Sequence, residues 1–281
     1  MSDRYAVVGN PVAHSRSPQI HALFARATGQ DIEYGRLLAP LDGFAAAVAN
    51  FAAEGGRGLN VTLPFKGQAF ELSTRRTPRA EAAGAVNTLS FEGGQVLGDN
   101  TDGIGLVRDI ENRVGLSLSG RSLLLIGAGG AAGGVVRPLL DAGLARLAIA
   151  NRSPERALEL ARRSKDARVQ GGGFELVVDA LADGQRFDAI VNATASGLAG
   201  ERLPLPDAVF AGAGLALDMF YAPRATPFMA QAGAAGCPRC CDGLGMLVEQ
   251  AAESFFVWRG LRPDTAPVYA ALRAELAASA C

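Results

Sequence analysis

Residues 122–134 read SLLLIGAGGAAGG, and this stretch decides the fold class. Its first five residues, Ser122–Ile126, form an unbroken apolar run of the kind that makes a strand buried in a parallel sheet. The turn that follows matches G-x-G-x-x-A, with Gly127, Gly129 and Ala132 at the fingerprint positions. Small residues there allow a tight turn and let the backbone approach a pyrophosphate at the positive end of a helix. The strand, turn and helix together favour a dinucleotide site over a purely structural turn.

The sequence beyond this turn continues to alternate between helices and strands. A helix is expected from the turn to about Ala142, and a second one, rich in Arg, Glu and Ala, over residues 154–164. Apolar runs predict further strands at residues 147–150, 189–193 and 215–218. This alternation predicts a Rossmann-type, doubly wound parallel sheet over residues 103–245.

The residues after the second strand of this sheet indicate which dinucleotide binds. The strand ends in Ala150, and Asn151, Arg152 and Ser153 follow, with Arg156 about one helical turn later. A site for NAD usually has an acidic residue at this point, and this sequence has none. Guanidinium groups pair well with phosphate oxygens. Cations are disfavoured at a helix N-terminus unless an anion is near, although they could simply face solvent there. The pattern favours NADP over NAD.

The first part of the chain shows an α/β pattern of its own. Strands are expected near residues 5–8, 33–38, 58–62, 88–91 and 96–97, and helices over residues 17–28, 44–53 and 102–113. Two further helices are expected over residues 244–278. We predict an α/β protein of two domains. The substrate-binding domain comprises residues 1–102, joined by C-terminal helices at 246–281, and residues 103–245 form the NADP-binding domain.

Polar residues of the first domain lie where strands end and helices begin. Lys66 opens a helix, where the helix dipole disfavours a cation and so favours a neutral lysine able to accept a proton. Asp102 follows a strand and starts a helix, and Asn87 immediately precedes a strand. Ser15 and Ser17 flank one residue at a helix entrance. The local pattern around Ser17 fits a helix N-cap better than a binding residue.

Composition excludes several classes of partner. The chain has 281 residues, of which 49% are hydrophobic, and a net charge of −1. No basic face is therefore expected for nucleic acid or for a membrane surface. No apolar run approaches the roughly 20 residues of a membrane span. The first residues lack the layout of a signal peptide, so a cytoplasmic location is expected.

Two of the four cysteines, Cys237 and Cys240, have C-x-x-C spacing, and Cys241 follows directly. This spacing could indicate metal or redox chemistry. A zinc site needs about four ligands. The only two histidines, His14 and His21, lie far away in the sequence. Ordinary reduced cysteines and no metal site are the preferred interpretation.

Nine segments resemble, in the same order, those of the shikimate dehydrogenase family. They are GNPVAHSRSP (9–18), NVTLPFK (60–66), GAVNT (84–88), GDNTDG (98–103), IGAGGA (126–131), NRS (151–153), VNATASG (191–197), DMFY (218–221) and DGLGMLVEQAA (242–252). The resemblance spans most of the chain. It implies NADPH-dependent, reversible reduction of 3-dehydroshikimate to shikimate, a step of chorismate and aromatic amino acid biosynthesis.

The resemblance also implies a role for individual residues. Its catalytic pair matches Lys66 and Asp102. The residues that match its substrate-binding positions are Ser15, Ser17, Thr62, Asn87, Tyr221 and Gln250. Those that match its NADP-binding positions are Gly127, Ala128, Gly129, Gly130, Ala131, Asn151, Arg152, Ser153, Arg156, Met219 and Gly243. The substrate is then a small molecule, and the assembly a monomer or a homodimer.

Two alternatives remain open on the sequence. One is a quinate/shikimate dehydrogenase that uses NAD, against which the Asn-Arg-Ser run at 151–153 argues. The other is a non-catalytic NADP-binding regulator on the same fold. The presence of both Lys66 and Asp102 argues against the regulator.

Overall fold

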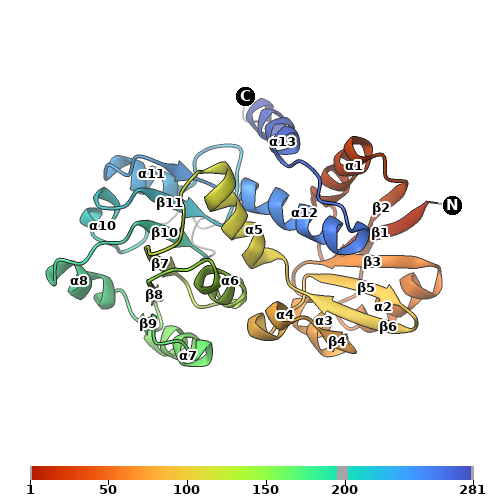
Figure 1. Ribbon diagram of the computed structural model, residues 1–281, viewed down its shortest axis with the longest axis horizontal. Coiled ribbons are helices and arrows are strands. Elements are labelled where there is room, and N and C mark those ends of the chain that lie inside the picture. Colours follow the sequence, from red (N-terminus) through yellow and green to blue (C-terminus); the bar gives the residue numbers. More distant parts are fainter. Residues whose placement is uncertain (1, 195–201, 280–281) are drawn as a thin grey trace. The chain divides into compact units, whose positions relative to one another are not determined.

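The computed structural model describes residues 2–194 and 202–279, and the chain divides into two compact units. The first unit comprises Met1–Leu106 and Leu247–Ala270, and the second comprises Val107–Met246 and Ala271–Cys281. Each unit is built on its own sheet, and Figure 1 labels all of their strands except β12.

The first sheet is mixed, with the strand order β2-β1-β3-β5-β6-β4. Strand β1 pairs in parallel with β2 and β3, whereas β5 pairs antiparallel with β3 and β6. The strands are β1 (Asp3–Gly9), β2 (Ile32–Leu38), β3 (Gly56–Val61), β4 (Arg75–Arg76), β5 (Thr88–Glu92) and β6 (Gln95–Asp99). The loops after β1 and β3 therefore leave the same edge of the sheet, which brings their polar residues together.

Helices of the first unit cover an apolar core on this sheet. The helices wholly within this unit are α1 (Ser17–Thr28), α2 (Phe44–Ala53), α3 (Lys66–Leu72) and α4 (Pro78–Ala83), whereas α5 (Asp102–Arg108), α12 (Leu244–Arg259) and α13 (Ala266–Ala278) each have residues in both units. Phe44 and Phe65 stack in this core with ring centroids 4.8 Å apart. The indole N–H of Trp258 donates to the carbonyl of Leu89 at 3.1 Å, which fixes α12 on the sheet.

The second sheet is parallel throughout, with the order β12-β11-β10-β7-β8-β9. Its strands are β7 (Ser122–Ile126), β8 (Arg146–Ala150), β9 (Val169–Gly172), β10 (Ala189–Asn192), β11 (Leu215–Asp218) and β12 (Cys240–Cys241). Read from β9, this is the 3-2-1-4-5-6 order of dinucleotide-binding domains, in which ligands bind where the order reverses. The predicted fold class is confirmed.

The helices of the second unit include α6 (Gly130–Asp141), α7 (Pro154–Ser164), α8 (Glu175–Ala182), α10 (Asp207–Ala211) and α11 (Pro227–Ala234). The strands read as apolar runs because they are buried, as the fully buried residues Leu123, Leu124, Leu125 and Ile126 show. The motif VNATASG begins in β10, and its last three residues, 195–197, lie outside the described residues.

The helix expected over residues 102–113 is confirmed, although its second part is not an α-helix. The α-helix α5 ends at Arg108, and a π-helical turn, η1 (Asp109–Arg113), continues it. The backbone N–H of Val114 donates to the carbonyl of Asp109 five residues earlier, at 3.0 Å. Asp109 is fully buried and forms an ion pair with Arg113. A buried acidic residue paired within the turn is a tertiary requirement that hydrophobic spacing does not reveal.

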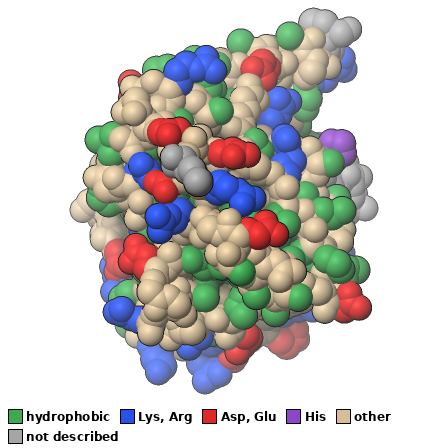
Figure 2. All heavy atoms as spheres, turned by 90° about the vertical axis from the view of Figure 1, so that its right-hand side faces the viewer, with side chains coloured by type: hydrophobic (Ala, Val, Ile, Leu, Met, Phe, Trp, Pro, Cys, Tyr) green, Lys and Arg blue, Asp and Glu red, His purple; other side chains and the backbone are tan. Residues whose placement is uncertain are grey.

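One face of the molecule is shown in space-filling form in Figure 2, where acidic and basic side chains are interspersed with hydrophobic ones. This mixing agrees with the net charge of −1. Of the helices that the structure describes, none is both long and apolar enough to cross a bilayer.

Candidate active site

Lys66 and Asp102 form an ion pair in the first unit. Lys66 Nζ lies 2.6 Å from Asp102 Oδ2, and the two side chains are 30% and 16% exposed. Both are accessible enough to meet a small molecule and buried enough for their attraction to be stronger than in water. Such a pair can hold a proton next to a polar substrate.

Chain turns at the edge of the sheet bring these two residues together. Thr62 follows β3, its carbonyl accepts from the N–H of Phe65 at 3.0 Å, and Lys66 then starts α3. Asp102 is the first residue of α5, where the helix dipole favours a carboxylate. The carbonyl of Lys66 accepts from the N–H of Val86 at 3.0 Å, which ties α3 to the segment before β5.

Asn87 is held so that its amide nitrogen faces Asp102. The backbone N–H of Thr101 donates to Asn87 Oδ1 at 2.8 Å. Because a backbone N–H can only donate, the atom opposite it must be the amide oxygen. Asn87 Nδ2 then donates to Asp102 Oδ1 at 2.8 Å. The carboxylate is thus bound at one oxygen by Lys66 and at the other by Asn87.

Ser15 and Ser17 lie side by side at the start of α1. Ser15 Oγ donates to Ser17 Oγ at 3.2 Å and accepts from the backbone N–H of Ser17 at 3.3 Å. The interpretation of Ser17 as a helix N-cap was wrong, because the cap position is Arg16 and no side chain there bonds the first turn. Ser15 Oγ instead accepts a hydrogen bond from the first backbone N–H of α1, that of Ser17. The Ser17 hydroxyl is consequently not needed as a cap.

The remaining predicted substrate-binding residues fall in both units. Gln250, on α12, places its Oε1 3.4 Å from Asn87 Nδ2 and belongs to the first unit. A side chain at Gly105 would collide with Gln250, since a Cβ there would lie 2.7 Å from its backbone nitrogen. Tyr221 lies in the second unit after β11 and stacks on Phe220 with ring centroids 6.3 Å apart.

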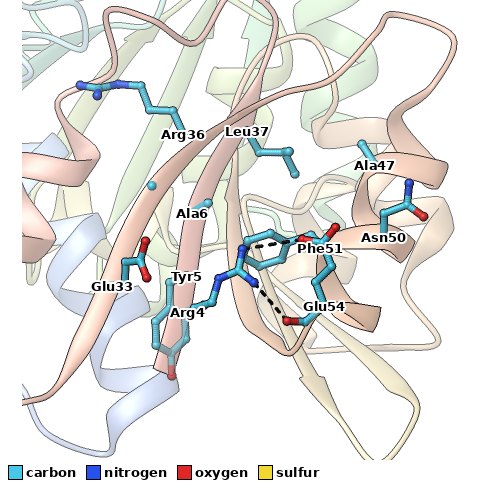
Figure 3. A pocket seen from close by; sticks show the side chains of 11 residues that line it. Arg4, Tyr5, Ala6, Glu33, Arg36, Leu37, Ala47, Asn50, Phe51 and Glu54 are labelled. Atoms are coloured by element: carbon cyan, nitrogen blue, oxygen red, sulfur yellow. Dashed lines mark hydrogen bonds and ion pairs between the residues drawn. The ribbon is translucent and has the colours of Figure 1, made fainter. Parts of the chain in front are cut away.

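A pocket opens beside β1, β2 and α2 (Figure 3) and contains none of the predicted site residues. Arg4 points across it to Glu54, with which it forms an ion pair of 3.7 Å. Another lining residue, Arg36, donates to the carbonyl of Ser15 at 2.7 Å and so steadies the loop that carries both serines.

The glycine turn after β7 requires glycine at its first position. Gly127 has φ +108°, and a Cβ there would lie 3.2 Å from the Ala193 backbone. Gly129 precedes α6 without any side-chain cap, and a Cβ on Gly129 or Gly130 would meet nothing within 4 Å. Gly129, Gly130 and Ala131, at the start of α6, are also exposed. Uncapped N–H groups at a helix start suit a phosphate.

The predicted NADP-selecting residues follow the neighbouring strand. β7 and β8 run in parallel with Ile126 opposite Ala150, so the residues after both strands lie at one edge. Asn151 Nδ2 donates to the Ser153 carbonyl at 3.0 Å, which shapes this turn. Arg152 and Arg156 are exposed, and within the described residues no hydrogen bond or ion pair engages either guanidinium. Two unengaged cations beside the glycine turn suit an extra phosphate.

Met219 and Gly243 follow β11 and β12 at the same edge. The N–H of Met219 donates to the Asn192 carbonyl at 2.9 Å. A Cβ on Gly243 would lie 2.1 Å from the Met219 carbonyl oxygen, so only glycine allows this approach. The two predicted residues are therefore in direct contact.

The cysteine segment is packed into the second unit. The thiol of buried Cys237 points to the carbonyl of Ala213 at 3.6 Å. Burial raises the pKa of the Cys240 thiol to about 11, which disfavours the thiolate that metal binding needs. Within residues 2–194 and 202–279, no group of three or more His, Cys, Asp or Glu side chains could hold a metal ion.

Sequence reasoning missed several polar residues around the pair. Tyr34, Asn60, Thr88 and Thr101 are buried or half-buried and hydrogen-bonded to one another or to Asn87. Asn60, Thr88 and Thr101 lie inside the family motifs, which could have indicated that they belong to the site. Nothing in the sequence distinguishes Tyr34, because tyrosine is common in strands.

Comparison with known proteins places these observations in a family. Family models match at residues 7–89 (shikimate dehydrogenase substrate binding domain), 109–199 (shikimate / quinate 5-dehydrogenase) and 243–273 (shikimate 5'-dehydrogenase C-terminal domain).

Individual relatives agree over nearly the full length. Shikimate dehydrogenase (NADP(+)) of Dechloromonas aromatica is 56% identical over 99% of this chain and 100% of its own. A crystal structure of an Ael1 enzyme from Pseudomonas putida is 47% identical, covers 96% of this chain and 98% of its own, and has a TM-score of 0.91. Shikimate 5-dehydrogenase from Thermus thermophilus, in complex with NADP(H) and shikimate, is 35% identical with a TM-score of 0.84, covering 96% of this chain and 98% of its own. The chain belongs to the shikimate dehydrogenase family.

Proposed function

We propose that this chain catalyses the reversible, NADP-dependent reduction of 3-dehydroshikimate to shikimate, a step toward chorismate and the aromatic amino acids. The observation that carries the proposal is the Lys66–Asp102 ion pair, 2.6 Å long and surrounded by amide and hydroxyl groups of the first unit. A relative 56% identical over its whole length bears the name shikimate dehydrogenase (NADP(+)). The Thermus thermophilus relative was solved with NADP(H) and shikimate bound.

Lys66 is the group we assign to proton transfer. Bound NADPH supplies the hydride that turns the ketone carbon into an alcohol carbon. The ketone oxygen then carries negative charge, and protonated Lys66 donates a proton to it. Asp102 stabilises the protonated lysine and holds its Nζ in place. In the reverse direction neutral Lys66 accepts the proton from the substrate hydroxyl.

The substrate is held by neutral polar groups. Ser15, Ser17, Thr62, Asn87 and Gln250 of the first unit supply hydroxyl and amide groups for a ring that carries hydroxyls and a carboxylate. Tyr221, for which the family resemblance implies the same role, belongs to the second unit. Such groups discriminate strongly, because a buried donor left unpaired by the wrong substrate is costly. We assign substrate binding to residues 1–102 with the C-terminal helices.

NADP fits the second unit on three observations. Gly127 adopts a backbone conformation that only glycine takes easily, and Gly129 and Gly130 leave open space above the start of α6. Arg152 and Arg156 are exposed beside that turn. The hydrogen bond from Asn151 to the Ser153 carbonyl shapes the loop that carries the two arginines. Met219 and Gly243 contact each other at the same edge of the sheet, after β11 and β12. We expect a cytoplasmic monomer or homodimer.

One assay tests the proposal. Purified protein is supplied with shikimate or quinate and with NADP or NAD, and formation of the reduced cofactor is followed. We expect shikimate with NADP to give the highest kcat/KM. Preference for NAD would support the quinate/shikimate alternative. Tight NADP binding without turnover of either substrate would support a regulator and overturn the proposal.

A further inference from the structure

A chain of polar side chains runs through the first unit from β2 to Asp102. The Tyr34 hydroxyl donates to Asn60 Oδ1 at 2.7 Å. Asn60 Nδ2 donates to Thr88 Oγ1 at 3.2 Å, and Thr88 Oγ1 donates to Asn87 Oδ1 at 2.9 Å. Asn87 Nδ2 then donates to Asp102 Oδ1 at 2.8 Å.

The direction of every bond in this chain follows from one backbone amide. The Thr101 N–H fixes Asn87 Oδ1 as an acceptor, so the Thr88 hydroxyl must donate its single proton there. Thr88 can then only accept from Asn60, which requires the Asn60 nitrogen to face Thr88 and its oxygen to face Tyr34. Tyr34 consequently has to donate to Asn60. Neighbouring contacts supplement this chain, since Thr88 Oγ1 also lies 3.5 Å from Thr101 Oγ1 and Asn60 Nδ2 also donates to the Asn87 carbonyl at 3.4 Å.

The chain is also buried, so unpaired members would be costly. Asn60, Asn87 and Thr88 are 6%, 3% and 0% exposed. A buried donor or acceptor that loses its partner costs about 1–3 kcal/mol. Successive hydrogen bonds of one sense also strengthen one another.

The far end of the chain contacts the helix that carries Ser17. The ring of Tyr34 stacks on His21 of α1, with centroids 4.1 Å apart and planes within 5°. Ser17 lies one helical turn before His21 in α1. The stacked rings therefore tie the helix that carries Ser17 to Tyr34.

We propose that Tyr34 is a positioning residue that couples the start of α1, with Ser17, to the Lys66–Asp102 pair through Asn60, Thr88 and Asn87. This inference rests on the proposed function, since it assigns no chemistry of its own. Its ring fixes α1, and its hydroxyl fixes the orientation of the two amides. Substrate held at Ser17 then meets an Asp102 carboxylate whose geometry is already set.

The test uses Tyr34→Phe in the full chain, which keeps the ring and removes the hydroxyl. Tyr5→Phe is the matched control, because Tyr5 is the neighbour of Tyr34 across β1 and β2, but its hydroxyl accepts from Arg259 at 3.5 Å instead. We expect kcat/KM for shikimate to fall about tenfold in Tyr34→Phe, the scale of one buried hydrogen bond. KM for NADP should stay unchanged, and the control should resemble the wild type.

Substitutions of Thr88 provide a second, independent test of the same inference. Thr88→Val should lower kcat, whereas Thr88→Ser, which keeps the hydroxyl, should restore it. The double variant Tyr34→Phe with Thr88→Val should lose little more than the worse single variant, because both break one chain. If Tyr34→Phe does not fold, the contrast between the Val and Ser variants of Thr88 decides.

Two results would overturn the inference in an active enzyme. One is a Tyr34→Phe variant with the same kinetics as Tyr5→Phe, or a Thr88→Val variant with the same kinetics as Thr88→Ser. The other is a double variant whose losses multiply, which would make the two residues independent. Absence of shikimate oxidation by the wild type would instead refute the proposed function.

Discussion

Lys66 and Asp102 are each the first residue of a helix, and their side chains meet at 2.6 Å. The dipole of α3 disfavours a cation at its start, whereas the dipole of α5 favours a carboxylate at its own. The Asp102 charge therefore offsets a position that is unfavourable for protonated Lys66.

Replacing Lys66 by Ala should reduce turnover far more than substrate binding. Without it, the alkoxide would form with no proton donor beside it. We expect kcat to fall about a hundredfold to ten-thousandfold, the range for loss of a general acid or base. Steady-state kinetics and titration calorimetry with shikimate provide the two measurements. Lys165→Ala is the control, since Lys165 is the only other lysine in the chain. A nearly normal kcat would refute the catalytic assignment, and loss of all shikimate binding would make Lys66 a binding residue.

Replacing Asp102 by Asn should lower turnover. The substitution keeps the shape of the side chain and removes the charge that pairs with Lys66 Nζ. We therefore expect kcat for shikimate to decrease in steady-state kinetics, because Lys66 would lose the group that holds it in place. Combined with Lys66→Ala, the substitution should add little further loss, because the two residues act as a unit. A wild-type kcat in Asp102→Asn would contradict the assignment.

Replacing Arg152 by Ala should weaken NADPH binding selectively. A charge-assisted hydrogen bond to phosphate is worth about 1.5–3 kcal/mol, so the dissociation constant should rise roughly tenfold to a hundredfold. NADH lacks that phosphate, and its binding should barely change. Arg163→Ala, at the far end of α7, is the control. Equal weakening of both cofactors would mean that Arg152 does not recognise the extra phosphate.

The parts of the fold and of the site that could be predicted are those that depend on residues adjacent in the sequence. The run from Ser122 to Gly130 specified a buried strand, a turn and a helix start, because each depends on local backbone requirements. The polar chain from Tyr34 to Asp102 was not predictable, since Tyr34 and Asn60 are separated by 26 positions. The cap at Ser17 was predicted wrongly because Ser15, two residues earlier, supplies the same acceptor.

Replacing His21 by Phe should remove a pH dependence of stability. His21 is fully buried, and neither ring nitrogen has a hydrogen-bond partner within the described residues. Burial lowers its pKa from 6.5 to about 3, an effect that nearby Asn60 opposes only weakly. In the unfolded chain His21 therefore binds a proton below pH 6.5, whereas in the folded chain it binds one only below about pH 3. Stability is lost as pH falls through this window, with a slope approaching about 1.4 kcal/mol per pH unit.

The measurement is the free energy of unfolding by denaturant from pH 7.5 to pH 5, compared between the wild type and His21→Phe, so that groups other than His21 contribute equally to both. We expect the wild type to lose roughly 1–2 kcal/mol over this range through His21, and His21→Phe to lose correspondingly less. At pH 7.5 the variant should lie within about 1.5 kcal/mol of the wild type, because the swap roughly conserves volume and removes two unpaired polar atoms. His14→Gln is the control, since His14 is exposed and should leave the wild-type slope unchanged. Parallel curves for the wild type and His21→Phe would show that His21 is protonated equally in the folded and unfolded chain.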